Sequence, residues 1–162
     1  MRILCICLLA ISSALFLAQS AMASATYTVK VKNKSANVIY LSNSSSNNTC
    51  IDSVDSKLSG MEVQPGKSTS FTFEDKNTYT GSCYHSYKGF VLGVSLNNTS
   101  GQKMNVYFMH YGTDPYYSQI TQGVPYGGIY LSNATCNNQD CLSKSVKYGG
   151  NGDYVIQIGQ MN

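Results

Sequence analysis

Apolar and polar residues alternate with a period of two along much of the chain after residue 23. In the segment TYTVKVKN (residues 26–33), Tyr27, Val29 and Val31 alternate with Thr28, Lys30 and Lys32. Such alternation is typical of a half-buried β-strand, so this segment predicts a strand with one apolar and one basic face. Residues 88–96 and 104–110 show the same parity on either side of a polar turn at 97–101, which predicts an antiparallel hairpin.

The remaining strand signals are short, and none of the chain shows a sustained helical period. Apolar runs or alternations mark four further expected strands, at residues 38–41, 71–73, 129–131 and 154–158. Turn residues rich in Gly, Asn and Ser separate them, including Pro65-Gly66. Short strands with such turns predict an all-β fold, an antiparallel β-sandwich with long loops.

The first 23 residues have the three parts of a secretory signal peptide. A Met-Arg start precedes an apolar run at residues 3–17, and Ala-Met-Ala at 21–23 supplies a cleavage site. The run is shorter than the roughly 20 residues that span a bilayer. We therefore expect residues 1–23 to be removed, residues 24–162 to form one domain, and the protein to be secreted, either outside the cell or into a periplasm.

Four cysteines remain after cleavage, and an even number in a secreted chain indicates disulfides. They are Cys50, Cys83, Cys136 and Cys141. Four cysteines allow three pairings. The short spacing favours a local Cys136–Cys141 clip, which leaves Cys50–Cys83, but the other pairings stay open. A zinc site is disfavoured because neither spacing is CxxC and export favours oxidation.

Charge and motifs argue against several classes of function. The formal charge of +3 is too small for nucleic-acid binding, which uses a basic face. A Ser/His/Asp triad would have to use His110 and Asp114, yet no G-x-S-x-G motif supplies the nucleophile. His85, His110 and Asp114 have no metal-site spacing, and no carboxylate pair stands out beyond Glu74-Asp75. We expect a non-enzymatic protein without cofactor or metal, with a hydrolase as a minor alternative.

Residues 107–130 hold six of the 13 tyrosines and two of the three prolines. The part from Tyr111 to Gly128 lacks alternation and is predicted to be a long ordered loop, a feature that is usually functional in compact domains. Tyrosine joins an apolar ring to a polar hydroxyl, which suits membrane interfaces, sugars and protein partners. The alternative is that some of these tyrosines only cap a core that lacks Trp. The candidate ligand-binding residues are Tyr111, Asp114, Tyr116, Tyr117 and Tyr126.

The order of these features resembles the actinoporin-like and aegerolysin group of secreted β-sandwich membrane binders. The resemblance is carried by four pieces: Val29-Lys30-Val31-Lys32-Asn33, Pro65-Gly66, Lys88-Gly89-Phe90, and the aromatic loop Tyr111-Gly112-Thr113-Asp114-Pro115-Tyr116-Tyr117. It implies that the aromatic loop meets lipid headgroups. The chain departs from the group because it has no Trp, has Asp before Pro in the loop, and enters a strand without the amphipathic N-terminal helix of actinoporins.

Together these features predict a secreted, non-enzymatic protein that binds an external surface through its tyrosine-rich loop. Membrane lipid is the leading ligand, with a cytolysin-like component as one form of that function. A carbohydrate-binding module that recognises a surface glycan is the second hypothesis. A structural or inhibitory protein, with a protein partner or as an oligomer, is the third. Lipid docking aided by lysines should weaken with salt, whereas sugar stacking should not.

Overall fold

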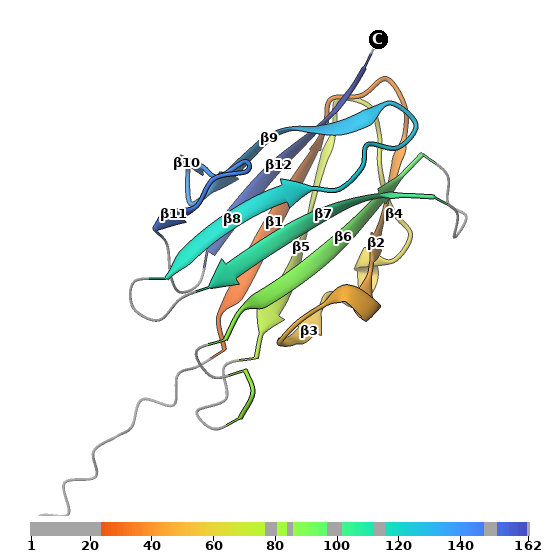
Figure 1. The fold of residues 1–162 in the computed structure, drawn as a ribbon. Coiled ribbons are helices and arrows are strands. Elements are labelled where there is room, and N and C mark those ends of the chain that lie inside the picture. Colours follow the sequence, from red (N-terminus) through yellow and green to blue (C-terminus); the bar gives the residue numbers. More distant parts are fainter. Residues whose placement is uncertain are drawn as a thin grey trace, which may run out of the picture.

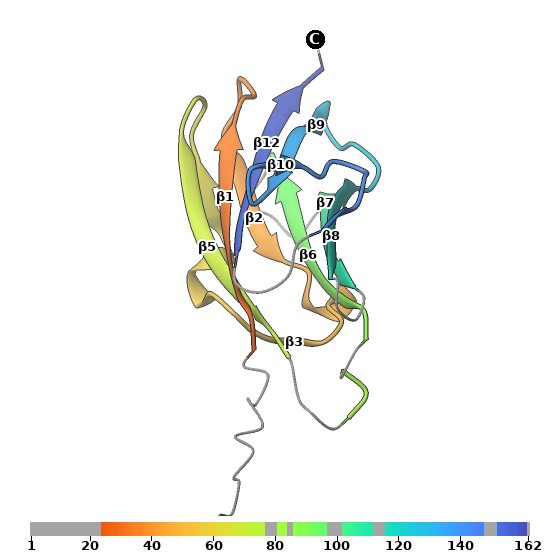
Figure 2. The ribbon, with the colours of Figure 1, turned by 90° about the vertical axis from the view of Figure 1, so that its left-hand side faces the viewer.

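Two six-stranded β-sheets pack face to face in the computed structural model (Figures 1 and 2). The structure describes residues 24–76, 81–83, 86–96, 102–111, 116–147 and 152–161. Sheet A has, in spatial order, β10 (Gln139–Asp140), β9 (Ile129–Cys136), β12 (Gly152–Gln160), β1 (Thr26–Asn33), β5 (Ser68–Asp75) and β3 (Ile51–Val54). Sheet B has β11 (Val146–Lys147), β8 (Tyr117–Gln122), β7 (Met104–Tyr111), β6 (Lys88–Ser95), β2 (Ile39–Asn43) and β4 (Met61–Val63). Two 3₁₀ turns, η1 (Ser45–Asn47) and η2 (Ser56–Leu58), flank β3.

The predicted all-β sandwich and the 88–110 hairpin are confirmed. β6 pairs antiparallel with β7, from Lys88 opposite His110 to Val94 opposite Met104. One pairing between the named strands is parallel: β1 lies beside β12, with Tyr27 opposite Gly152. Strand alternation does not show the direction of the neighbouring strand, so the sequence pattern could not reveal this pair.

The core lies between the sheets and follows the period-two pattern. β1 alternates exposed and buried residues along its length. Rings of Phe and Tyr pack together in the core, where the centroid of Phe73 lies 4.6 Å from that of Phe90 and 5.0 Å from that of Tyr27. Tyr27 also stacks on Tyr154, with their ring planes 4° from parallel. Burial of such rings is a large part of what holds a sandwich of this size together.

The predicted long loop from Tyr111 to Gly128 is wrong, because a strand occupies its middle. β8 pairs antiparallel with β7, from Tyr111 opposite Tyr117 to Val106 opposite Gln122. Its inward positions are Ser118 and Ile120, both fully buried. Since one inward residue is polar, the apolar alternation that signals a strand is missing from the sequence.

Both disulfides form with the favoured pairing. Cys136–Cys141 closes the short β9–β10 hairpin, and Cys50–Cys83 ties the start of β3 to the segment that leads into β6. Residues 1–23, the predicted signal peptide, lie outside the described residues. Within the described part of the chain, no helix has the length and apolar character needed to cross a bilayer.

Candidate functional site

Several strands end or begin together at one end of the sandwich, at the lower left of Figure 1. β5 ends at Asp75, β6 begins at Lys88, β7 ends at Tyr111 and β8 begins at Tyr117. The strand register sorts their residues into two rows. Lys88, His110 and Ser118 lie side by side and face the core, and we call them the inner row.

The adjacent residues form the outer row, Tyr111, Tyr117 and Lys147, which faces away from the core. Tyr117 lies opposite Tyr111 on β7 and opposite Lys147 on β11. Because side chains alternate between the two faces of a sheet, this row lies on the outer face of sheet B while the inner row is buried.

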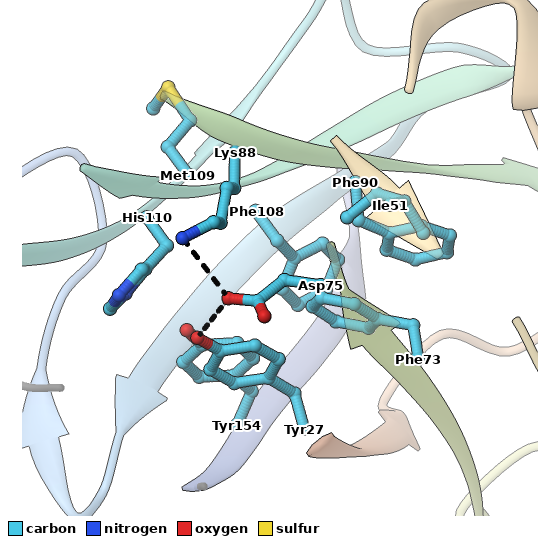
Figure 3. A pocket seen from close by; sticks show the side chains of 10 residues that line it. All are labelled: Tyr27, Ile51, Phe73, Asp75, Lys88, Phe90, Phe108, Met109, His110 and Tyr154. Carbon is cyan, nitrogen blue, oxygen red and sulfur yellow. Dashed lines mark hydrogen bonds and ion pairs between the residues drawn. The ribbon is translucent and has the colours of Figure 1, made fainter. Parts of the chain in front are cut away.

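The inner row contains a buried ion pair. Lys88 Nζ lies 3.7 Å from Asp75 Oδ2, and both side chains are almost fully buried. Tyr27 Oη donates to the same carboxylate oxygen at 3.2 Å, and the backbone N–H of Ala25 donates to Oδ1 at 2.9 Å. Figure 3 shows the carboxylate between the lysine and the tyrosine hydroxyl. A charge buried this deeply requires such partners, so the cluster ties the ends of β1, β5 and β6 together.

His110 and Ser118 continue the polar cluster across the core. His110 Nδ1 lies 3.0 Å from Ser118 Oγ, and Ser118 Oγ lies 3.2 Å from Tyr154 Oη. Burial lowers the pKa of His110 to about 4, with Asp75 opposing and Lys88 reinforcing that shift. The imidazole is therefore neutral at pH 7, because its burial disfavours the charged form.

The inner row has little scope for catalysis. The cavity among its side chains and the neighbouring aromatic rings is about 10 Å³, which holds no more than about one water molecule. Ser118 touches a histidine, as a nucleophile would, but its side chain is fully buried and beyond reach of a substrate. Among the described residues, no three His, Cys, Asp or Glu side chains cluster as metal ligands. The inner row and its partners form a polar cluster that closes this end of the core.

The outer row is the accessible part of this end. The rings of Tyr111 and Tyr117 stack with centroids 6.1 Å apart, and Tyr117 is 37% exposed. The Tyr111 hydroxyl also shares a hydrogen bond with Ser145 Oγ. Lys147 is exposed beside Tyr117. The outer row therefore presents two amphipathic rings and a cation to solvent.

The other predicted site residues lie in different places. Tyr116 is half-buried and stacks on His110 at 5.1 Å, with Lys88 Nζ 6.0 Å from its ring centre, so it covers the inner row. Tyr126 follows the opposite end of β8, bridges to Ile129 and packs on the core. Asp114 lies outside the described residues. The structure thus brings Tyr111, Tyr116 and Tyr117 together but not Tyr126.

Lys147 was not among the predicted site residues. It belongs to β11, which has only two residues and is too short to show a period in the sequence. Its place beside Tyr117 comes from strand pairing between segments about 30 residues apart along the chain, which no local sequence signal carries.

Comparison with known proteins assigns no family. No family model matches the chain, and no curated protein matches it. Among solved structures, the chain is similar to IP-1A from Alcaligenes faecalis, with 7% identity, 85% of this chain and 92% of that chain covered, and a TM-score of 0.47. RahU, solved with a Tris molecule, shares 12% identity over 85% and 96% of the two chains, with a TM-score of 0.49.

A third structure, the lipid binding protein Nakanori, shares 7% identity over 85% of this chain and 71% of its own, with a TM-score of 0.42. All three scores lie below 0.5, so these likenesses assign neither a family nor a function. The resemblance to actinoporin-like proteins and aegerolysins therefore stays a hypothesis that rests on the sequence.

Proposed function

We propose that this chain is a secreted, non-enzymatic protein that docks onto membrane lipid through the outer row, Tyr111, Tyr117 and Lys147. The observation that supports it is the register of β7, β8 and β11, which sets two stacked tyrosines and a lysine side by side at the rim of the sandwich. Tyrosine is enriched where proteins meet the headgroup level of a bilayer, because its ring is apolar and its hydroxyl is polar.

Lys147 extends the tyrosine pair with a positive charge. A lysine close to an anionic leaflet contributes about 1 kcal/mol of attraction, and the attraction fades within a Debye length. With one lysine in the row, aromatic contacts supply most of the affinity and charge supplies a smaller, salt-sensitive part. The proposal therefore predicts binding that added salt reduces but does not abolish.

The buried cluster behind the outer row holds the docking residues in place. The inner row fixes the ends of β6, β7 and β8 through the Lys88–Asp75 pair and the His110–Ser118 contact. Tyr116 also packs on this cluster, because its ring stacks on His110. A rigid rim loses less conformational entropy when it meets a surface. The two disulfides agree with a protein that works in an oxidising compartment outside the cytosol.

The test is co-sedimentation of the purified protein with vesicles of phosphatidylcholine and phosphatidylserine. We expect Tyr117→Ala to reduce the bound fraction severalfold. Tyr130→Ala, which removes a half-buried tyrosine from the outer face of sheet A, should leave it unchanged. Equal loss in both variants, or no binding by the wild type, would contradict the proposal.

Dye release measured on the same vesicles separates docking from perforation. Release together with binding would support a cytolysin-like component, whereas binding without release would indicate docking alone. Both variants are checked by thermal melting, so that a loss of binding is not confused with a loss of fold.

A further inference from the structure

The buried ion pair of the inner row connects the two sheets. Asp75 is the last residue of β5 in sheet A, and Lys88 is the first residue of β6 in sheet B. Lys88 Nζ lies 3.7 Å from Asp75 Oδ2, and the two side chains are 3% and 2% exposed. Figure 3 shows the lysine reaching toward the carboxylate. An amine and a carboxyl group held this close together and hidden from solvent are the two reactants of an amide bond.

Aromatic rings enclose the pair and exclude water from it. The Phe and Tyr side chains that line the cavity beside the pair are Tyr27, Phe73, Phe90, Phe108 and Tyr154. Separate charges are costly in such surroundings. Transfer of a proton from Lys88 Nζ to Asp75 removes both charges and leaves an amine and a carboxylic acid. These neutral forms can condense, whereas an ammonium ion has no lone pair with which to attack.

The two oxygens of Asp75 are placed for different parts of such a reaction. The backbone N–H of Ala25 donates to Oδ1 at 2.9 Å. Negative charge develops on this oxygen when an amine attacks Cγ, and a fixed N–H is the kind of donor that stabilises it. Tyr27 Oη donates to Oδ2 at 3.2 Å, and this hydrogen bond favours the departure of Oδ2 as water.

We propose that Lys88 and Asp75 form an intramolecular isopeptide bond in the folded protein. Lys88 Nζ attacks Asp75 Cγ, the bond from Cγ to Oδ2 breaks, and an amide bond between Nζ and Cγ takes its place. The departing hydroxyl group takes one hydrogen from Nζ and leaves as water, so the reaction needs no oxidant and no further reactant. Oδ1 becomes the amide oxygen and keeps its hydrogen bond from Ala25. The cavity of about 10 Å³ beside the pair has room for about the one water molecule that is released.

The fold supplies the proximity that this condensation needs. Because Cγ is bonded to Oδ2, Lys88 Nζ is at most about 5 Å from the carbon that it attacks. Small rotations in the lysine side chain reduce this to the roughly 3–3.5 Å of a near-attack arrangement. Reactants positioned in this way behave as if each were present at about 10⁵–10⁸ M. Once formed, the amide is protected from hydrolysis because its surroundings are dry.

The other ion pair within the described residues lacks these surroundings. Lys144 Nζ lies only 2.6 Å from Asp140 Oδ2, but both side chains are more than half exposed. Water stabilises both charges there, so the amine stays protonated and does not attack. Closeness alone is therefore not sufficient for a bond, and this exposed pair is a matched control within the same chain.

The isopeptide bond adds to the two disulfides a covalent link that reductants do not break. It joins sheet A to sheet B at the end of the core that lies behind the outer row. The bond forms within the protein itself, so it does not depend on what the outer row binds.

The test is the intact mass of the purified protein, measured after its disulfides have been reduced. We expect the wild type to be lighter than its calculated mass by one water molecule. Lys88→Arg keeps the positive charge but has no amine that can attack, and it should have its full calculated mass. Tyr117→Ala, which changes only the outer row, should show the same loss of water as the wild type. A wild type of full mass, or an equal loss of water in Lys88→Arg, would overturn the proposal.

Tryptic digestion of the reduced and alkylated wild type locates the bond. Trypsin cleaves after lysine, but it does not cleave after a lysine whose side chain is acylated. We expect a branched peptide in which residues 68–76 are joined to residues 77–103. Cleavage after Lys144 should proceed as usual, because the exposed pair forms no bond. Recovery of residues 77–88 and 89–103 as separate peptides would overturn the proposal.

The lipid and isopeptide proposals fail separately. Tyr117→Ala should lose vesicle binding and keep the loss of one water molecule. A wild type of full mass that still binds vesicles would overturn the isopeptide bond alone. A wild type that is lighter by one water molecule but does not bind vesicles would overturn lipid docking alone.

Discussion

Single polar residues decide the character of the tyrosine-rich end. Lys88, His110 and Ser118 occupy inward positions where a sandwich normally carries apolar side chains. Each has a partner: Asp75 for Lys88, and a shared hydrogen bond for His110 and Ser118. At these positions the core loses hydrophobic burial, but the polar contacts fix the ends of the strands. The fixed strand ends in turn position the accessible tyrosines of the outer row.

His110 makes stability depend on pH in a defined direction. The unfolded chain takes up a proton on this histidine near pH 6.5, and the folded protein does so only near pH 4. The unfolded state therefore binds more protons between these values, and stability falls as pH drops from about 6.5 to about 4. The shift corresponds to at most about 3 kcal/mol.

Urea unfolding at pH 7.5, 5.5 and 4.5 measures this effect. The difference between wild type and His110→Gln isolates the histidine from the carboxylates that titrate in the same range. Wild type should lose more stability than the variant as pH falls, and parallel curves for the two proteins would contradict the assigned shift.

At the scale of elements, regular alternation is what made strands predictable. The pattern of residues 26–33 and the shared parity of 88–96 and 104–110 were enough for β1, β6 and β7. β8 was missed because Ser118 replaces an apolar residue on its inward face. The parallel β1–β12 pair joins segments at the two ends of the domain, and no local pattern records which distant strand becomes a neighbour.

The composition of the candidate site was predictable to a similar degree. The density of tyrosines pointed to Tyr111, Tyr116 and Tyr117, and the structure places these three together. Tyr126 belongs to the same tyrosine-rich stretch of the sequence, but it lies beyond the other end of β8. Lys147 enters through strand register. Register is a property of the assembled sheet.

The two disulfides should differ in their contribution to stability. Cys50–Cys83 closes a loop of 33 residues and Cys136–Cys141 one of five. In the chain-entropy description these correspond to about 4 and about 2 kcal/mol. Replacement of each pair by alanine, followed by urea unfolding, should destabilise the protein more for Cys50/Cys83. The opposite order would show that the buried Cys136–Cys141 clip acts mainly through packing.

At the scale of the whole molecule, the two outer faces have different chemistry. The outer face of sheet A carries Lys30, Lys32, Glu74 and Asp153, whereas the outward-facing residues of β6, β7 and β8 are mostly tyrosines, amides and glycines, with the Lys103 side chain over Gly93. In the proposed function, the membrane meets sheet B at the rim where its strands end. Sheet A also supplies controls, because it offers residues of the same type on the opposite side.

The most direct test of lipid docking uses the absence of Trp from the chain. Tyr117→Trp places a single fluorescent reporter in the outer row, and Tyr130→Trp places one on the outer face of sheet A. On addition of vesicles of phosphatidylcholine and phosphatidylserine, the account predicts a blue shift of the emission for the first variant and none for the second. An unchanged spectrum at position 117 in protein that sediments with the vesicles, or a shift confined to position 130, would contradict docking through the outer row.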